Sequence, residues 1–132
     1  MSEFSYKALP NIGAIDLSVV SFSQSLKFYK DVFGARVIDE SDSSMLLSFG
    51  NVFINLKPLS YGFYGCLSKN GLVRLFIMID QSINAFCEEL ACKDVAVLRG
   101  PTYREGAMGN ISAVYIRDPD LNIIEVGSYA YD

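Results

Sequence analysis

The fold follows from residues 15–34, which read IDLSVVSFSQSLKFYKDVFG. The first six residues alternate as a strand does, and Ser23 is the expected N-cap of the segment that follows. Gly34 is the natural place for a helix to end. Apolar residues recur between these two points at helical spacing. The predicted apolar face of the helix contains Phe22, Leu26, Tyr29 and Phe33.

The rest of the chain continues this pattern and then repeats it. Three strand-like runs follow the first helix, with Gly50-Asn51 as a tight turn between the last two. The second half has a strand, a helix capped by Ser82, and again three strand-like runs. The predicted strands after the first helix are residues 35–39, 45–49 and 52–57, and those of the second half are 72–79, 95–98, 111–116 and 123–126.

The repeat predicts an α+β fold of two βαβββ modules in one domain, residues 1–132. The modules would span 12–57 and 72–129, joined by a linker at 58–71. We expect a curved mixed sheet with the helices on its outer face, and a ligand on the concave face. A longer loop, residues 99–110, separates the second and third strand-like runs of the second half.

Charge and composition narrow the classes of partner. The 132 residues include 11 Lys and Arg against 15 Asp and Glu, a formal net charge of −4. This balance argues against nucleic acid or an anionic membrane as the main partner and leaves a neutral or cationic small molecule. The absence of histidine excludes a Ser-His-Asp triad and every His-ligated metal site. Three cysteines without a C-x-x-C spacing, and no secretory signal, predict free, buried thiols in the cytoplasm.

Two segments resemble the vicinal oxygen chelate superfamily, which includes glyoxalase I, bleomycin- and fosfomycin-resistance proteins and extradiol dioxygenases. Residues 25–34, SLKFYKDVFG, are similar to the family's "FY…LG" helix, and residues 117–126, RDPDLNIIEV, to its closing "RDPDGNxIE" hairpin. The resemblance implies paired βαβββ modules and a homodimer. The family has glycine where Leu121 stands. If that position needs a positive φ, a leucine there costs about 1 kcal/mol.

In metal-bearing members the ligands come from the first and last strand of each module. The resemblance carries these positions onto Ala14, Asn55, Arg74 and Glu125. Alanine offers no donor atom, arginine would repel a cation, and about three good donors are needed. We therefore expect no metal and no cofactor.

Arg74 and Glu125 would lie on neighbouring strands and form an ion pair in the place of the metal. One interpretation is a structural ion pair that stabilises the sheet. The other is a ligand-binding pair, with a donor fork and an acceptor. Glu125 is also the best single candidate for a catalytic residue, although an arginine beside it opposes its use as a general base.

Several further residues are candidate ligand contacts. Tyr61 and Tyr64 lie in the linker, either as an aromatic wall over a pocket or as a loop packed on the core. Tyr103 and Arg104 lie in the glycine-flanked stretch 100–109, either a movable cover or a solvated loop. Tyr115 lies on a strand and could face the cleft.

Three functions are compatible with these features. The first is a metal-free binding protein, similar to the bleomycin-resistance branch, that sequesters a small aromatic or cationic compound and so confers antibiotic resistance. The second is a glyoxalase-like lyase or isomerase, or a dioxygenase, with an atypical metal site. The third is an interaction module without a ligand. The sequence leaves open whether any reaction is catalysed.

Overall fold

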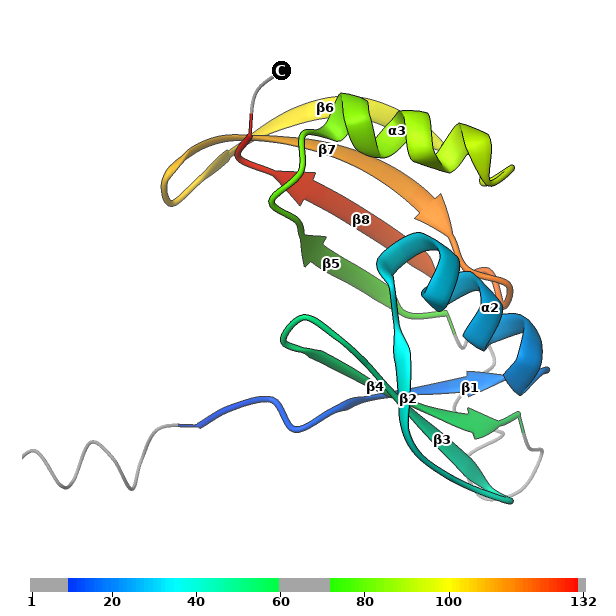
Figure 1. Cartoon of the computed structure of the whole chain (residues 1–132). Coiled ribbons are helices and arrows are strands. Elements are labelled where there is room, and N and C mark those ends of the chain that lie inside the picture. Colours follow the sequence, from blue (N-terminus) through cyan, green and yellow to red (C-terminus); the bar gives the residue numbers. More distant parts are fainter. Residues whose placement is uncertain (1–9, 60–71, 131–132) are drawn as a thin grey trace, which may run out of the picture.

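The computed structural model describes residues 10–59 and 72–130, and it contains the βαβββ order twice (Figure 1). This confirms the predicted α+β fold. The first module consists of β1 (Ile15–Val19), α2 (Phe22–Phe33), β2 (Arg36–Ser41), β3 (Ser44–Phe49) and β4 (Val52–Pro58). The second consists of β5 (Arg74–Met78), α3 (Ile83–Cys92), β6 (Arg99–Gly106), β7 (Gly109–Arg117) and β8 (Ile123–Ser128).

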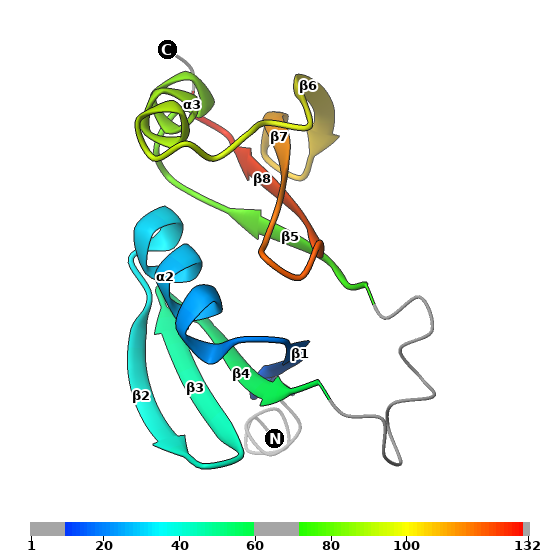
Figure 2. The same cartoon turned by 90° about the vertical axis from the view of Figure 1, so that its right-hand side faces the viewer.

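The strands form two mixed four-stranded sheets with the same topology. The first sheet has the order β1-β4-β3-β2 and the second the order β5-β8-β7-β6. In each sheet the first strand of the module pairs in parallel with the last, and the other pairs are antiparallel. Helix α2 lies between the two sheets in both views (Figures 1 and 2).

Helix α2 begins two residues earlier than the sequence pattern predicts. Ser21, not Ser23, is the N-cap, because its backbone is extended and its hydroxyl accepts a hydrogen bond from the Gln24 amide at 3.2 Å. The Ser23 hydroxyl instead lies 3.1 Å from that of Ser21. Gly34 ends the helix as predicted, with a φ of 73° that glycine adopts without strain.

Strand β6 is the main departure from the prediction. The sequence indicated a strand at 95–98 and a loop at 99–110, but Arg99–Gly106 is a strand that pairs with β7. Gly100 and Pro101 lie at a register shift between Arg99 and Thr102, which interrupts the regular strand pattern. Because β6 is an exposed edge strand, it lacks the apolar alternation that marks a strand in a sequence.

The core joins both modules. One face of each sheet is apolar, and these two faces pack with the helices into a single cluster of buried side chains. Across the joint, Phe33 of α2 stacks on Phe86 of α3 with ring centroids 6.2 Å apart. The cluster includes Leu17, Val19, Tyr29, Leu47, Ile54 and Leu56 from the first module and Leu75, Ile77, Phe86, Leu90, Val114, Ile116, Ile124 and Val126 from the second.

The loop between β7 and β8 is the second part of this joint. The Tyr29 hydroxyl on α2 donates to Asp118 Oδ2 at 2.7 Å, and the Val20 amide donates to Asp120 Oδ1 at 2.9 Å. Burial and the Asp118 carboxylate raise the pKa of Tyr29 far above its ordinary value. The two motifs that carried the family resemblance therefore contact each other. No helix in the described part of the chain is long and apolar enough to cross a membrane.

Candidate functional site

Glu125 lies near the centre of the face of the second sheet that is turned away from the core. We call this the open face, and its register follows from the strand pairing. Glu125 on β8 is paired with Phe76 on β5 and with Tyr115 on β7, so the three side chains lie side by side. Glu125 is buried, Tyr115 is half-buried, and Phe76 is 45% exposed. An acidic group therefore lies between two aromatic rings, one of them accessible.

Arg104 of β6 extends across the open face to Glu125. Its Nη1 atom donates to both carboxylate oxygens, at 3.1 Å to Oε2 and 3.3 Å to Oε1. The guanidinium carbon lies 4.7 Å from the centroid of the Phe76 ring, a cation–π contact. The Arg104 side chain is 50% exposed and that of Glu125 is 10% exposed. Because water screens an ion pair this exposed, the pair contributes at most about 1 kcal/mol to the stability of the fold. Its main effect is to balance the negative charge of Glu125 with the positive charge of Arg104.

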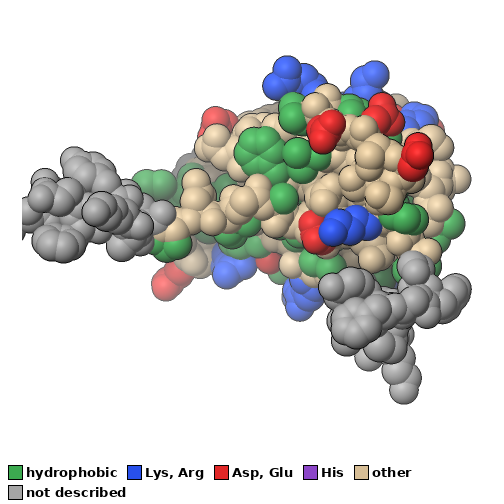
Figure 3. Space-filling view, turned by 90° about the horizontal axis from the view of Figure 1, so that it is seen from below, with side chains coloured by type: hydrophobic (Ala, Val, Ile, Leu, Met, Phe, Trp, Pro, Cys, Tyr) green, Lys and Arg blue, Asp and Glu red, His purple; other side chains and the backbone are tan. Residues whose placement is uncertain are grey.

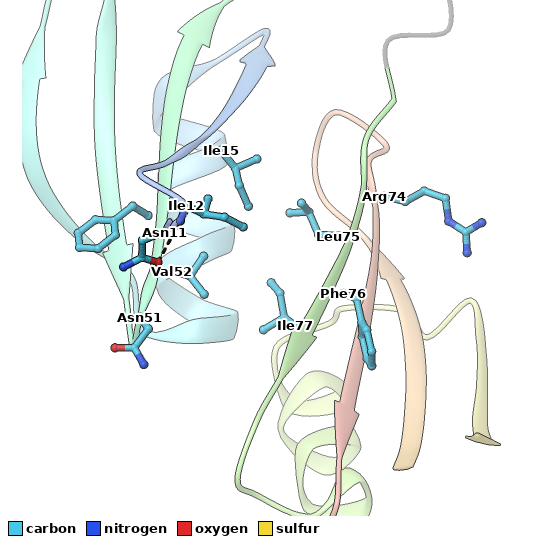
Figure 4. A pocket seen from close by; sticks show the side chains of 10 residues that line it. Asn11, Ile12, Ile15, Asn51, Val52, Arg74, Leu75, Phe76 and Ile77 are labelled. Atoms are coloured by element: carbon cyan, nitrogen blue, oxygen red, sulfur yellow. Dashed lines mark hydrogen bonds between the residues drawn. The ribbon is translucent and has the colours of Figure 1, made fainter. Parts of the chain in front are cut away.

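The predicted partner of Glu125 was wrong. Arg74 is paired with Ile123, two residues before Glu125 along β8, and Arg104 is the arginine that contacts the carboxylate. Arg74 does lie on the open face, pointing away from the core side of β5, as Phe76 does (Figure 4). The sequence analysis therefore placed Arg74 on the correct face of the sheet but two residues away from the true partner position of Glu125. The reason is that the ends of a strand cannot be located exactly from sequence.

The same displacement corrects the metal-ligand positions implied by the family. Asn55 on β4 is paired with Asp16, not Ala14, and Glu125 is paired with Phe76, not Arg74. Phenylalanine has no donor atom for a metal. The Asp16 carboxylate lies 3.3 Å from the Lys57 amine, and Glu125 contacts Arg104. In the described residues no three acidic or cysteine side chains cluster. These residues do not fit a catalytic metal.

The remaining candidates separate into three places. Tyr115 lies on the open face beside Glu125. Tyr103 precedes Arg104 on β6, so its side chain lies on the opposite face, and it is 74% exposed. Asn55 is half-buried on the first sheet. Tyr61 and Tyr64 lie outside the described residues. The structure thus brings together Glu125, Arg104 and Tyr115 of the predicted set.

Comparison with known proteins agrees with this fold. A model of the glyoxalase/bleomycin resistance protein/dioxygenase superfamily matches residues 11–126. The chain belongs to this superfamily. It is 31% identical over 123 residues to virulence protein STM3117 of Salmonella typhimurium, covering 92% of this chain and 85% of that protein. The crystal structure of STM3117 superposes with a TM-score of 0.78, over 92% of this chain and 98% of that one.

Two further solved structures, one at higher and one at lower identity, have a similar fold. A protein from the mobile metagenome of V. Pseudocholerae is 30% identical, with a TM-score of 0.78 over 93% of this chain and 97% of that one. The fosfomycin resistance protein FosX of Listeria monocytogenes is 15% identical, with a TM-score of 0.67 over 92% of this chain and 95% of that one. The latter likeness shows the fold alone.

Phe76 is a member of the site that the sequence analysis missed. The signal was present as the alternation of residues 74–78, where Leu75 and Ile77 are buried and Phe76 is exposed. Gly127 makes room for this ring, because a Cβ atom there would lie 2.9 Å from Phe76 Cε1 and 2.8 Å from Ile111 Cγ2. The segment that resembles the superfamily motif ends at Val126, one residue before Gly127, so the resemblance did not indicate this glycine.

An apolar pocket of about 360 Å³ opens on the other side of β5. Ile15 and Val52 of the first sheet face Leu75 and Ile77 of β5 across it (Figure 4). Glu125 and Arg104 do not line it. The pocket therefore opens into the joint between the modules, and it also reaches the edge of the open face, because Arg74 and Phe76 are among its lining residues.

The two described cysteines lie on α3 and not on the open face. Cys87 of α3 is half-buried, and burial raises its pKa, which lowers the fraction of reactive thiolate. Cys92 is exposed at the end of α3 rather than buried. Cys66 lies outside the described residues.

Proposed function

We propose that this superfamily member is a metal-free binding protein that sequesters a small molecule on the open face of the second sheet. The observation that supports this is the contact between Arg104 and Glu125 over the exposed ring of Phe76. The Arg104 guanidinium lies beside Glu125, where a metal-binding member of the superfamily would hold its ion. The cluster can recognise a ligand but has no group that would activate one.

The acid–base groups of the open face favour binding over catalysis. The chain has no histidine, so a general base would have to be a carboxylate or a lysine. Glu125 is the carboxylate at the centre of this face, and Arg104 neutralises it. The rings of Phe76 and Tyr115 offer surface for a planar group. Each of these features favours recognition without turnover.

We also propose that a second copy of the chain completes the site. Within one chain, Ile15 and Val52 of the first sheet and Leu75 and Ile77 of the second point toward each other (Figure 4). The opposite faces of both sheets are consequently directed away from each other. A homodimer in which the first sheet of one copy lies over the open face of the other would enclose the ligand. Such an arrangement would bring Asn55 of the partner subunit to the site.

We further propose that the protein acts in the cytoplasm. Cys87 and Cys92 are free thiols, as in proteins of a reducing compartment, which supports the cytoplasm. Sequestration of a toxic compound would make the protein an antibiotic-resistance factor. The matched superfamily and FosX, a protein named for fosfomycin resistance, support that idea only by likeness.

A thermal-shift screen tests the binding function. The panel contains planar aromatic compounds and cationic glycopeptides, each with and without a chelator. Binding to the native state raises the melting temperature, and we expect the rise to persist with the chelator. The variant Tyr115→Ala should lose the rise. Its matched control, Tyr103→Ala, should keep it, because Tyr103 lies on the other face of the sheet.

Other outcomes favour the alternative functions. A rise that appears only with added transition metal would favour a glyoxalase-like lyase, isomerase or dioxygenase. No rise with any compound would favour an interaction module. Equal loss in Tyr115→Ala and Tyr103→Ala would remove the open face as the site.

A further inference from the structure

We propose that the ligand of the open face carries an oxyanion, a carboxylate or phosphate group bound by a ring of arginines. This inference rests on the proposed function and specifies its ligand class. It also revises the neutral or cationic ligand that the overall charge favours. The reason is that the arginines of this chain are concentrated on one face of one sheet. The sequence has five arginines: Arg36, Arg74, Arg99, Arg104 and Arg117.

The strand register places four of them on the open face. Arg74 of β5 and Arg117 of β7 are both paired with Ile123, which lies between them on β8. Their Cα atoms are thus two strand spacings apart, about 10 Å. Arg99 of β6 is paired with Tyr115 in the neighbouring row, the row that contains Glu125. Paired residues share a face, so these side chains lie on the same face as Glu125, in its own row and in the row next to it.

The fourth is Arg104, whose guanidinium reaches Glu125 from the far end of β6. One of its nitrogens, Nη1, serves both carboxylate oxygens. A guanidinium has five N–H donors, so this contact uses only part of its capacity. The remaining donors can bind a ligand oxygen beside the Phe76 ring without breaking the ion pair.

The local charge of the open face is opposite to that of the chain. The strand positions of the open face carry four arginines and one carboxylate, that of Glu125. Their formal net charge is 4 − 1 = +3, whereas the formal net charge of the whole sequence is −4. Arg74, Arg99 and Arg117 are exposed, and none pairs with an acidic side chain of the described residues. By contrast, the face seen from below, over the first sheet, mixes acidic and basic side chains (Figure 3).

Arginine is the side chain suited to this role. Its planar fork matches the two oxygens of a carboxylate or phosphate, and such charge-assisted hydrogen bonds are roughly twice as strong as neutral ones. A small molecule is the occupant we favour over nucleic acid, because the net charge of −4 opposes a long polyanion outside this face. Phe76, at 45% exposure, supplies an apolar contact next to the arginines.

Calorimetric titration with three matched probes tests the proposal: phenylphosphonate, benzyl alcohol and benzamidine, which share a ring and differ in charge. We expect phenylphosphonate to bind and the other two to bind at least roughly tenfold more weakly. Arg74→Gln and Arg117→Gln should each weaken phenylphosphonate binding by roughly tenfold. Lys30→Gln, the same charge change on exposed α2, should leave it unchanged.

The outcomes of these titrations distinguish failure of the oxyanion class from failure of the sequestration function. If benzamidine or benzyl alcohol binds more tightly than phenylphosphonate, and Tyr115→Ala abolishes that binding, the sequestration function stands and the oxyanion class is wrong. If none of the probes binds, the oxyanion class is wrong, and the thermal-shift panel alone decides the sequestration function. Saturable binding of duplex DNA that Arg74→Gln and Arg117→Gln abolish would overturn the small-molecule class in favour of nucleic acid.

Discussion

Asp118 links the loop between β7 and β8 to helix α2 of the first module. Its Oδ1 atom accepts hydrogen bonds from the amides of Asp120 and Asn122, each at 2.9 Å. Its Oδ2 atom accepts one from the Tyr29 hydroxyl at 2.7 Å and one from the Asn122 side chain at 2.9 Å. One buried carboxylate thus shapes its own turn and also contacts the helix of the other module.

Replacing Tyr29 by phenylalanine tests this contact. Tyr29→Phe removes one of the hydrogen bonds to the buried carboxylate and should lower the free energy of unfolding by about 2 kcal/mol, measured by urea denaturation at neutral pH. Ser25→Ala is the control, because its hydroxyl makes only a longer bond, 3.3 Å, to Asp120. An unchanged stability in Tyr29→Phe would show that the contact contributes nothing.

The raised pKa of Tyr29 predicts a pH dependence with a definite sign. Above its ordinary pKa of 10.0, unfolded Tyr29 loses its proton while the folded side chain keeps it. The unfolded state then binds fewer protons, so the free energy of unfolding falls as pH rises above about 10. Denaturation measured between pH 8 and 11 should show a shallower fall in Tyr29→Phe than in the native chain. Equal slopes would contradict the shift.

Leu121 lies in the same turn with a φ of 71°, a conformation that L-residues disfavour. Leu121→Gly should therefore raise the free energy of unfolding by up to about 1 kcal/mol, measured by thermal denaturation. Leu98 is similarly exposed, at 51% against 53%, and is not among the residues with a positive φ, so Leu98→Gly should destabilise. Destabilisation by Leu121→Gly would mean that the leucine side chain contributes more than its backbone strain costs.

At the scale of elements, the strands that bury one face were predictable and the exposed edge was not. Residues 45–49 and 123–126 were found because their apolar residues face a core, and the structure extends each by only a few residues. Arg99–Gly106 was missed because an edge strand in solvent needs no apolar face. The Arg104–Glu125 contact was missed with it, since a residue placed in a loop has no register.

Gly127 tests the packing of the open face at this scale. Gly127→Ala would place a methyl group within 3 Å of Phe76 and Ile111, so we expect a loss of about 1–3 kcal/mol in the free energy of unfolding. It should also displace the Phe76 ring and weaken ligand binding. Gly13→Ala is the control, because no atom lies within 4 Å of a Cβ built there. Equal stabilities of the two variants would contradict the close packing.

For the whole molecule, the repeat and the two family motifs were sufficient to predict the fold. The structure brings the two motifs together, because Tyr29 of the first donates a hydrogen bond to Asp118 of the second. The face proposed to bind the ligand was predictable only in part. Glu125 was identified, but its partner was not, because a shift of two residues keeps the face and changes every neighbour.

The proposed homodimer is tested by sedimentation equilibrium. We expect the mass of two chains. A charge placed on the face of the first sheet that would cover the ligand, Asn55→Arg, should shift the equilibrium to monomer, because it would face Arg104 and the neighbouring arginines of the partner copy. The control is Lys30→Gln on α2. A native chain that sediments as a monomer would contradict the dimer.

The most direct test of a metal-free site is calorimetric titration of the chelator-treated chain with Zn²⁺, Ni²⁺ and Mn²⁺, followed by the same titration of Glu125→Gln. With Arg104 on Glu125 and phenylalanine at position 76, we predict no tight one-to-one binding of any of the three ions. Tight, stoichiometric binding that Glu125→Gln abolishes would contradict the account.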